Sequence, residues 1–455
     1  MSNTKQKSGL SAEGVAPIQV GLLGIGTVGS GTFNVLRRNQ EEIRARAGRG
    51  IEIRAVSARN VERAKQRVGN AVRVVGDPWE LINDPAIDII VEAIGGSSMA
   101  RELVLGAIAA GKHVVTANKA LLAIHGTEIF SAAREKGVMV AFEAAVAGGI
   151  PIIKSLREGL TANRIEWVAG IINGTTNFIL SEMRSKQLEF ATVLKEAQRL
   201  GYAEADPTFD IEGIDAAHKL TIMSAIAFGV PVQFDRAYVE GITQLKPIDI
   251  TYAAQLGYRV KLLGVTRRRF DLGGIELRVH PTLVPSTRLI ANVEGAMNAV
   301  AVQGDAVGTT LYYGKGAGSE PTASAVIADL VDVTRLHTAD RDHRVPHLAF
   351  QPDAMSNLPI LPMDQTQTAY YLRLQVADQA GVLSAITTIL AENDISIDAV
   401  LQKESESSAG ETPQTDLIIL THETQEASMN AALTKMQTLK TVLAPIVRIR
   451  KEELA

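Results

Sequence analysis

The sequence of 455 residues contains no cysteine, few aromatic residues (4%) and no long hydrophobic run. Without cysteine there can be no disulfide, no thiolate metal site and no thiol nucleophile, so enzymes that oxidise aldehydes through a cysteine adduct are excluded. The longest largely apolar stretch, 220–232, is too short to cross a bilayer. The polar N-terminus lacks the apolar segment of a secretory signal. We therefore expect a cytoplasmic protein whose residues 1–16 form a flexible tail.

The chain also lacks a large excess of charge of one sign, because 46 basic residues nearly balance 50 acidic ones. A net charge of −4 gives no reason to expect nucleic acid or a membrane surface as a partner. The apolar share of 46% and the charged share of 21% are typical of a globular protein. The length predicts two or three domains.

Residues 17–150 alternate short apolar runs with helical segments. The runs IQVGLL, IEIRAVS, DIIVEAI, HVVTA and VMVAFEA are nearly continuous in apolar residues, as in parallel strands that are covered on both faces. Helices are expected between them, for example over 30–46 and 101–110. The alternation predicts an α/β, Rossmann-like, doubly wound nucleotide-binding domain, completed by part of 310–345.

The rest of the chain divides at a proline-rich stretch. Residues 151–340 mix helices with alternating runs and predict an α+β domain, and 341–367 read as a linker. Over 368–455 the order strand, helix, strand, strand, helix, strand predicts a ferredoxin-like domain.

A glycine-rich turn, GIGTVG, directly follows the first expected strand. Its glycines allow a tight turn, close approach of a pyrophosphate and close helix packing, and the next helix N-terminus favours negative charge. The context of a βαβ unit favours a dinucleotide site over a plain turn. The expected contacts are Gly24, Gly26, Thr27, Val28 and Gly29.

The end of the second expected strand bears on the choice of cofactor. It reads Val56-Ser57-Ala58-Arg59 and lacks the carboxylate that usually binds the ribose of NAD. Ser57 and Arg59 could hold a 2′-phosphate, so NADP is favoured without excluding NAD. Arg59 could equally be a solvated loop cation.

Lys119 and Lys219 are the candidate lysines for chemistry. Lys119 follows the expected strand HVVTA at the carboxyl end of the sheet, where cofactors bind, although most lysines are surface residues. Lys219 stands four residues after Asp215 on an expected helix, so the two share one face. They form either a surface ion pair or, with the preceding carboxylates Glu204 and Asp210, a site for an amino-acid substrate with a reducible carbonyl.

Two glycine-rich segments remain. The segment 143–151 combines Glu143 with accessible carbonyls, which suits either a hard cation or a simple hinge. The segment 313–322 precedes an apolar helix, and Gly316 and Gly318 could approach a cofactor there or only start a capped helix. Histidines show no pairing typical of a transition-metal site, and there is no GxSxG motif.

Over nearly its whole length the chain resembles homoserine dehydrogenases. The glycine turn, TANK at 116–119, EAAVAGGIP at 143–151, INGTTNFI at 172–179 and GYAEADPTFDIEGIDAAHKL at 201–220 occur in that family in this order. The C-terminal zone resembles an ACT regulatory domain, with DQAGVL at 378–383 as its strand–helix turn. Without an aspartokinase region before it, the chain is similar to the monofunctional type.

The resemblance implies an oxidoreductase that reduces L-aspartate 4-semialdehyde to L-homoserine with NADPH or NADH, on the route to threonine, methionine and isoleucine. It implies Lys219 as proton donor, Lys119 near the carbonyl and the nicotinamide, and Glu204 and Asp215 on the substrate amino group. It also implies a homodimer formed through the substrate domain, and feedback by threonine through the ACT domain. A monovalent cation such as sodium would be held by Glu143 and the carbonyls of Val146, Gly148 and Ile150.

The residues suit this chemistry, because hydride delivery to an aldehyde builds negative charge on oxygen that an ammonium stabilises and protonates. His218 departs from members that carry arginine before the lysine, which puts the charge around the lysine in question. Two other hypotheses remain: a non-catalytic amino-acid sensor, and a dehydrogenase for another semialdehyde or hydroxy acid. The ACT domain could also serve assembly alone.

Overall fold

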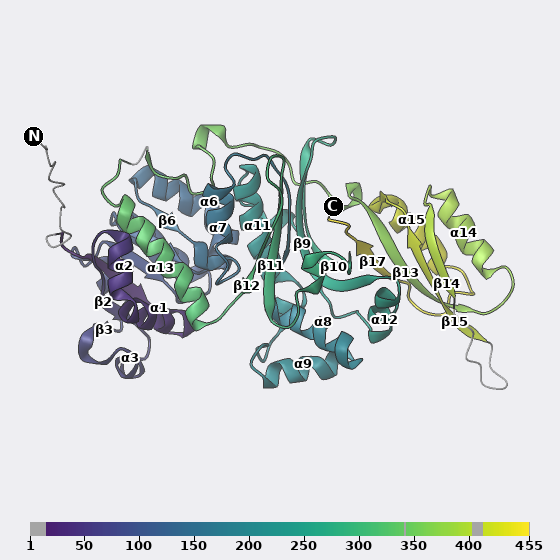
Figure 1. Cartoon of the computed structure of the whole chain (residues 1–455), viewed down its shortest axis with the longest axis horizontal. Helices are drawn as coiled ribbons and strands as arrows, with labels where there is room; N and C mark the ends of the chain where they lie inside the picture. Colours follow the sequence, from purple (N-terminus) through teal and green to yellow (C-terminus); the bar gives the residue numbers. More distant parts are fainter. Residues whose placement is uncertain (1–14, 341–342, 403–412, 455) are drawn as a thin grey trace, which may run out of the picture. The chain divides into compact units, whose positions relative to one another are not determined.

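The computed structural model describes residues 15–340, 343–402 and 413–454 (Figure 1). The chain divides into two compact units. The first unit comprises Met1–Gly159 and Ala317–Asp353, and the second comprises Leu160–Gly316 and Ala354–Ala455. Apart from its last two residues, the expected tail 1–16 lies outside the described residues.

The second unit is built on an 11-stranded sheet. Its main path runs β12-β11-β7-β9-β10-β17-β13-β15-β14, with β8 paired to β10 and β16 paired to β13. The strands are β7 (Ile165–Ile171), β8 (Tyr238–Val239), β9 (Tyr258–Arg269), β10 (Gly274–Pro285), β11 (Met297–Gly304), β12 (Gly308–Lys315), β13 (Gln367–Ala377), β14 (Ile397–Gln402), β15 (Gln414–Thr421), β16 (Thr424–Gln425) and β17 (Val447–Lys451). The helices are α8 (Gly174–Lys186), α9 (Phe190–Arg199), α10 (Thr208–Ile211), α11 (Ile214–Phe228), α12 (Pro247–Gln255), α14 (Val382–Glu392) and α15 (Glu426–Gln437).

The C-terminal part of this unit has the element order β13, α14, β14, β15, α15, β17, which confirms the predicted ferredoxin-like domain. Its last strand has two roles. β17 pairs antiparallel with β13 of the same domain and parallel with β10, where Thr282 lies opposite Arg450. The ferredoxin-like domain and the substrate domain therefore share one continuous sheet.

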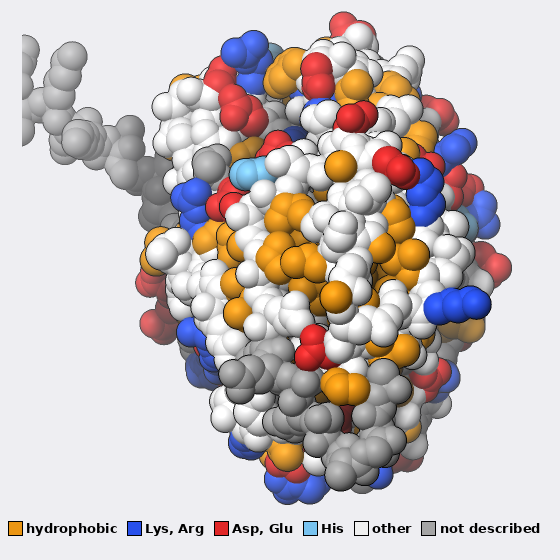
Figure 2. Space-filling model, turned by 90° about the vertical axis from the view of Figure 1, so that its right-hand side faces the viewer, with side chains coloured by type: hydrophobic (Ala, Val, Ile, Leu, Met, Phe, Trp, Pro, Cys, Tyr) orange, Lys and Arg blue, Asp and Glu red, His pale blue; other side chains and the backbone are white. Residues whose placement is uncertain are grey.

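Figure 2 shows hydrophobic side chains gathered near the centre of one face of the molecule. Large hydrophobic residues exposed in the C-terminal domain are Leu383, Val400 and Leu443. Val400 lies on β14, an edge strand of the sheet. Among the described helices, none is long and apolar enough to span a membrane.

The first unit has a six-stranded parallel sheet in the order β3-β2-β1-β4-β5-β6, which is the Rossmann order and confirms the predicted doubly wound fold. The strands are β1 (Ile18–Leu23), β2 (Ile51–Ser57), β3 (Arg73–Val75), β4 (Ile89–Glu92), β5 (His113–Thr116) and β6 (Val140–Ala141). The helices are α1 (Thr27–Arg38), α2 (Gln40–Ala47), α3 (Val61–Val68), α4 (Trp79–Ile82), α5 (Ser98–Ala109), α6 (Lys119–Lys136), α7 (Ile152–Lys154) and α13 (Ser319–Leu336).

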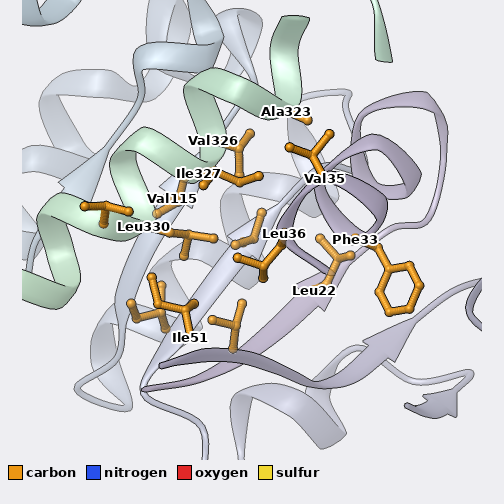
Figure 3. Packing of buried hydrophobic residues seen from close by; sticks show 14 of the residues in the cluster. Leu22, Phe33, Val35, Leu36, Ile51, Val115, Ala323, Val326, Ile327 and Leu330 are labelled. Carbon is orange, nitrogen blue, oxygen red and sulfur yellow. The ribbon is translucent and has the colours of Figure 1, made fainter. Parts of the chain in front are cut away.

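The core of this unit joins residues that are far apart in the sequence. Leu22 of β1, Leu36 of α1 and Leu330 of α13 are at most 4% exposed and belong to one hydrophobic cluster (Figure 3). Helix α13 lies beside α1, although about 280 residues separate them in the chain. Residues after 310 therefore contribute a helix to the nucleotide-binding fold.

The helix expected over 30–46 is in fact two helices. Asn39 ends α1, where its N–H donates to the Val35 carbonyl, and its own carbonyl accepts from Ile43 N–H at the start of α2. Asparagine favours helix ends because its side chain competes with backbone hydrogen bonds. The helical pattern on both sides hid this break.

The glycine turn between β1 and α1 is sterically demanding at two positions. Gly24 has φ of +93°, and a Cβ there would lie 2.8 Å from the Ala93 carbonyl oxygen. A Cβ on Gly29 would lie 2.1 Å from the Gly24 carbonyl oxygen, so α1 can approach β1 only with glycine there. At Gly26 a Cβ would meet nothing within 4 Å. The middle glycine is therefore not required by packing, which leaves close approach of a ligand as its physical reason.

We expect Gly26→Ala and Gly29→Ala to separate cofactor binding from folding. Gly29→Ala should lower the free energy of unfolding by roughly 1–3 kcal/mol, because backbone must shift. Gly26→Ala should cost at most about 1 kcal/mol of stability. If the turn binds the dinucleotide expected from the sequence, this substitution should weaken NADPH binding by about tenfold or more, because the methyl group would occupy the space expected for the pyrophosphate. Thermal unfolding and NADPH fluorescence titration measure the two effects. Unchanged NADPH affinity in Gly26→Ala would contradict the assignment of this turn.

Candidate functional site

Two loops at the carboxyl end of the first sheet are tied together by Glu92, at the end of β4. This fully buried carboxylate accepts hydrogen bonds from the N–H groups of Ile94 (2.9 Å) and Gly95 (3.1 Å) and from Thr116 Oγ1 (2.6 Å). Asn118 Nδ2 donates to the Gly96 carbonyl at 2.6 Å. The loop after β4 is thereby fixed to the TANK turn after β5. Sequence reasoning missed Glu92, although a carboxylate inside an apolar strand was a signal.

Lys119 begins α6 directly after this turn and is half-buried. Asn118 caps the helix, because its Oδ1 accepts from Leu121 N–H at 3.0 Å. The Lys119 backbone is therefore held rigidly at the carboxyl end of the parallel sheet, where dinucleotide-binding folds place their cofactor.

The end of β2 carries no carboxylate in the folded unit. Ser57 is buried and its carbonyl accepts from Gly24 N–H at 3.0 Å, whereas Arg59 is exposed just before α3. A second cation reaches the glycine turn, because Arg67 of α3 donates to the Ile25 carbonyl and, at 3.3 Å, to Ser30 Oγ. Nothing in the sequence singled out Arg67, because only the folded unit brings α3 to the turn.

The second glycine segment also has a structural explanation at each predicted residue. Gly318 has φ of +134° and precedes α13, whose Ser319 Oγ donates to the Thr27 carbonyl at 2.9 Å. Gly318 therefore lies near the start of α1. Gly316 packs against Asn298, where a Cβ would lie 2.0 Å from Nδ2. This close packing alone requires glycine at Gly316.

In the second unit, Lys219 and Asp215 form a buried ion pair on α11. The Lys219 amine donates to Asp215 Oδ2 at 2.6 Å and to the Ile172 carbonyl at 2.8 Å. Asp215 is 3% exposed and Lys219 is 9% exposed. The alternative of a solvated surface pair is therefore wrong. Burial removes both charges from water, so each needs its partner.

Asn173 links this pair to Asp210. Its Nδ2 donates to Asp215 Oδ2 at 2.9 Å and to Asp210 Oδ1 at 2.7 Å, while its Oδ1 accepts from Thr176 N–H and caps α8. Thr175 Oγ1 also donates to Asp210, at 3.1 Å. The INGTTNFI motif contains Asn173, but the sequence alone did not indicate that this residue belongs to the site.

The acidic residues of the site differ in their environments. Burial, with the neighbouring charge of Asp215 as the next cause, raises the pKa of Asp210 above its usual value. Glu204 is exposed. The structure thus brings Asp210, Asp215 and Lys219 together and leaves Glu204 at the surface.

His218, the residue that departs from the family pattern, is buried between two aromatic rings. Its ring lies 5.2 Å from that of Phe209 and 4.2 Å from that of Phe234, edge-on in both cases. The His218 ring therefore packs against aromatic residues of the segments that precede and follow α11.

The cluster offers one ammonium and two carboxylates within a few ångströms of one another. A buried ammonium stabilises developing negative charge on oxygen and can give up a proton, and carboxylates bind the amino group of an amino acid. The residues therefore suit the reduction of a carbonyl on an amino-acid substrate.

Glu143 occupies a second polar pocket, in the first unit. Its carboxylate is 1% exposed and accepts from the N–H groups of Ile153 (2.9 Å) and Lys154 (2.8 Å). Burial raises its pKa to about 6. The buried Asp329 of α13 accepts from Glu143 N–H at 2.8 Å, and its pKa is raised by burial and by the charge of Glu143.

The turn after Glu143 is tight and contains the candidate carbonyl ligands. Ala147 (φ 54°) and Gly148 (φ 49°) are both left-handed. The Ile150 carbonyl accepts from Ile152 N–H at 2.8 Å and keeps a second lone pair, as each Glu143 oxygen does. Oxygen ligands beside two buried carboxylates fit a hard monovalent cation.

Comparisons with known proteins agree with these features. The family model for homoserine dehydrogenase matches residues 151–331, the model for the NAD binding domain of homoserine dehydrogenase matches 24–143, and the ACT domain model matches 370–440. The chain is 61% identical to a homoserine dehydrogenase of Pseudomonas aeruginosa over 438 residues, which is 96% of this chain and 99% of the relative. It is 57% identical to that of Neisseria gonorrhoeae over 440 residues, again 96% and 99%.

Solved structures give the same result. A homoserine dehydrogenase from Thiobacillus denitrificans superposes with a TM-score of 0.92 at 66% identity, covering 97% of this chain and 99% of the other. A hyperthermophilic archaeal homoserine dehydrogenase in complex with NADPH superposes with a TM-score of 0.60 at 25% identity, over 70% of this chain and 98% of the other. The chain belongs to the homoserine dehydrogenase family, with an NAD-binding Rossmann domain and a C-terminal ACT domain.

Proposed function

We propose that the cluster of Asp210, Asp215 and Lys219 is where this oxidoreductase reduces the aldehyde of L-aspartate 4-semialdehyde to the hydroxyl of L-homoserine. The observation that carries the assignment is the buried Lys219 amine, held between Asp215 Oδ2 and the Ile172 carbonyl. These two acceptors fix the position of the amine.

The residues then act in a defined order. Asp215 binds the substrate amino group, and Asn173 fixes the Asp215 carboxylate. Glu204 joins them when its exposed side chain turns toward the substrate. When bound, the reduced nicotinamide supplies a hydride to the aldehyde carbon. Lys219 gives a proton to the carbonyl oxygen, so the aldehyde gains one hydride and one proton to become the alcohol. In the reverse direction Lys219 must first lose its proton, so homoserine oxidation should accelerate toward alkaline pH.

The protein binds a nicotinamide cofactor, and we propose that NADP is preferred. The end of β2 lacks a carboxylate and is followed by the exposed Arg59, and Arg67 contacts the glycine turn. These cations suit the added negative charge of a 2′-phosphate. Gly24, Gly26, Thr27, Val28 and Gly29 would hold the pyrophosphate. Lys119 and Gly318 complete the proposed cofactor contacts, together with Gly316, for which packing is an equal explanation.

Lys219→Ala should reduce turnover about 10²- to 10⁴-fold while NADPH affinity stays nearly unchanged, because the proton donor is lost and the glycine turn is intact. The assay follows nicotinamide absorbance with semialdehyde and NADPH or NADH, and in reverse with homoserine. A small panel of other semialdehydes and hydroxy acids, run in parallel, separates this activity from a related dehydrogenase. No absorbance change with any of them would favour a sensor.

Lys261→Met is the matched control for removing a buried lysine. Lys261 is 2% exposed, burial lowers its pKa to about 8, and its amine donates to the Val293 carbonyl (2.6 Å) and Asn177 Oδ1 (3.1 Å). Its loss should lower thermal stability but keep turnover within about threefold of the wild type. Equal losses of turnover in both variants would show that Lys219 matters for folding alone.

We also propose that Glu143 and the carbonyls of Val146, Gly148 and Ile150 bind a monovalent cation such as sodium. Its support is the left-handed turn and the two buried carboxylates, Glu143 and Asp329, that would share the positive charge. The cation would neutralise the negative charge of these carboxylates and stiffen the turn without entering the reaction.

Replacing an organic cation by Na⁺ at constant ionic strength should raise the unfolding temperature by a few degrees at pH 7, because binding to the native state alone stabilises it. Glu143→Gln should abolish this rise. Glu135→Gln, at an exposed carboxylate of the same unit, is the control and should keep it. A Na⁺ response that survives Glu143→Gln would rule out this site.

The ACT domain indicates regulation by a small molecule, and we propose threonine as the ligand and a homodimer as the assembly. The C-terminal domain exposes Leu383, Val400 and Leu443. Figure 2 shows hydrophobic side chains gathered on one face of the molecule, and exposed apolar patches are typical of an association surface. The substrate domain, 151–340, remains our proposed dimerisation region on family resemblance, and a cytoplasmic location stays a prediction.

Added threonine should lower the initial rate of the full chain and raise its unfolding temperature with the same half-saturating concentration, because one binding event causes both. Serine at equal concentration is the control ligand. If threonine raises the unfolding temperature but leaves the rate unchanged, the ACT domain binds threonine without regulating the enzyme's activity. No response in either measurement would remove threonine as the ligand.

A further inference from the structure

The last strand of the ACT domain carries a buried arginine that reaches into the substrate domain. Arg450 of β17 is 1% exposed. Within its own domain it pairs with Glu426, at 2.9 Å from Nε and 2.5 Å from Nη2. Across the domain junction its Nη1 donates to Glu240 Oε2 at 2.8 Å, and its Nη2 donates to the Tyr238 hydroxyl at 3.1 Å. One guanidinium therefore holds groups from both domains.

Glu240 is fixed by more than this one contact. The Tyr238 hydroxyl donates to Glu240 Oε2 at 2.8 Å, and the Glu240 N–H donates to the Val279 carbonyl of β10 at 2.8 Å. Because β8 also pairs with β10, the short segment 238–242 is held by the sheet through its backbone and by Arg450 through its side chains. Charge-assisted hydrogen bonds of this kind are stronger than neutral ones.

The next residues of that segment hold the turn between α10 and α11. Ile242 N–H donates to the Ile211 carbonyl at 2.9 Å. Gly241 packs so closely that a Cβ would lie 2.5 Å from the Ile211 carbonyl oxygen and 2.6 Å from Glu212 Cα. Gly213, which has φ of +81° and precedes α11, packs against Val239. Movement of 238–242 therefore has to move this turn.

The turn 211–213 stands between two residues of the proposed site. Asp210 immediately precedes it, and Asp215, the partner of Lys219, follows it two residues later. Asn173 bridges Asp210 and Asp215 at 2.7 and 2.9 Å, so a shift of the turn changes the separation that this amide spans. Contacts within hydrogen-bond or packing distance thus run continuously from Arg450 to Lys219.

We propose that Glu240 is a positioning residue: held by Arg450 of the ACT domain, it sets the α10–α11 turn and through it the Asp215–Lys219 pair. This inference rests on the proposed role of Lys219. It assigns to the ACT domain a direct mechanical contribution to the substrate site, through a carboxylate that touches neither substrate nor cofactor. Coupling through a packed and hydrogen-bonded segment with a defined position is physically sufficient for this.

Glu240→Gln tests the proposal in the full chain. Arg450 keeps Glu426, so the buried guanidinium stays compensated and the fold should survive. We expect kcat/KM for homoserine to fall about 3- to 30-fold, mainly through KM, and the alkaline rise in homoserine oxidation to shift in pH. NADP affinity should be unchanged. A purely structural role would not move the pH profile.

Asp249→Asn is the matched control at the same domain junction. Asp249 of α12 is fully buried and pairs with Arg373 of β13, at 2.6 Å from Nε and 3.1 Å from Nη2, and it accepts from the Tyr371 hydroxyl at 3.1 Å. It therefore also joins the ACT domain to the substrate domain through a carboxylate, but on α12 rather than beside the α10–α11 turn. It should lower the unfolding temperature with little change in KM or in the pH profile.

A double-mutant cycle with Arg450→Lys completes the test. If Glu240 acts through Arg450, the effects of the two substitutions on kcat/KM should be strongly non-additive. Additive effects, or equal KM and pH profiles in Glu240→Gln and Asp249→Asn, would overturn the coupling while leaving the proposed function intact. Normal turnover in Lys219→Ala, measured alongside, would instead overturn the proposed function and this inference with it.

Discussion

The buried pair of Lys219 and Asp215 is the interaction on which the surrounding polar structure depends. An ammonium and a carboxylate removed from water are stable only together and only if their remaining hydrogen-bonding capacity is used. The Ile172 carbonyl and the Asn173 amide supply those bonds, and Asn173 in turn fixes Asp210. Five residues from three segments of the chain are therefore held in one arrangement, which is the preorganisation that the proposed carbonyl reduction needs.

The continuous sheet of the second unit gives the ACT domain a structural role beside its proposed regulatory one. β17 belongs to the ACT domain by sequence, yet it is also the strand that covers β10 of the substrate domain. Glu452, just after β17, pairs with Arg278 of β10 at 2.6 Å and with Arg267 of β9 at 3.1 Å. Removing the domain would expose the edge of β10 and leave these two arginines with fewer partners. Deletion therefore cannot separate regulation from folding, whereas single side-chain changes can.

The nucleotide-binding unit shows how much a local pattern predicts. Parallel strands buried on both faces must be almost wholly apolar, so β1, β2, β4 and β5 stood out in the sequence, and the glycine turn marked the first crossover. The three-residue β3 was too short to show a pattern, and the break at Asn39 lay inside a continuous helical signal. Residues such as Glu92 and Arg67 were missed because their roles come from contacts with loops that only folding brings near.

By itself, the sequence determined the α/β class, the Rossmann unit, the ferredoxin-like C-terminal domain and the spacing that puts Asp215 and Lys219 on one helix face, because each is a periodic or short-range property of the chain. The tertiary structure alone decided that this pair is buried, that Asn173 joins it to Asp210, that Glu204 lies at the surface and that Arg450 reaches Glu240. Burial and the pairing of charges depend on which distant segments pack together. The sequence pattern shows which side chains are present, but not which of them become buried and must therefore pair with one another.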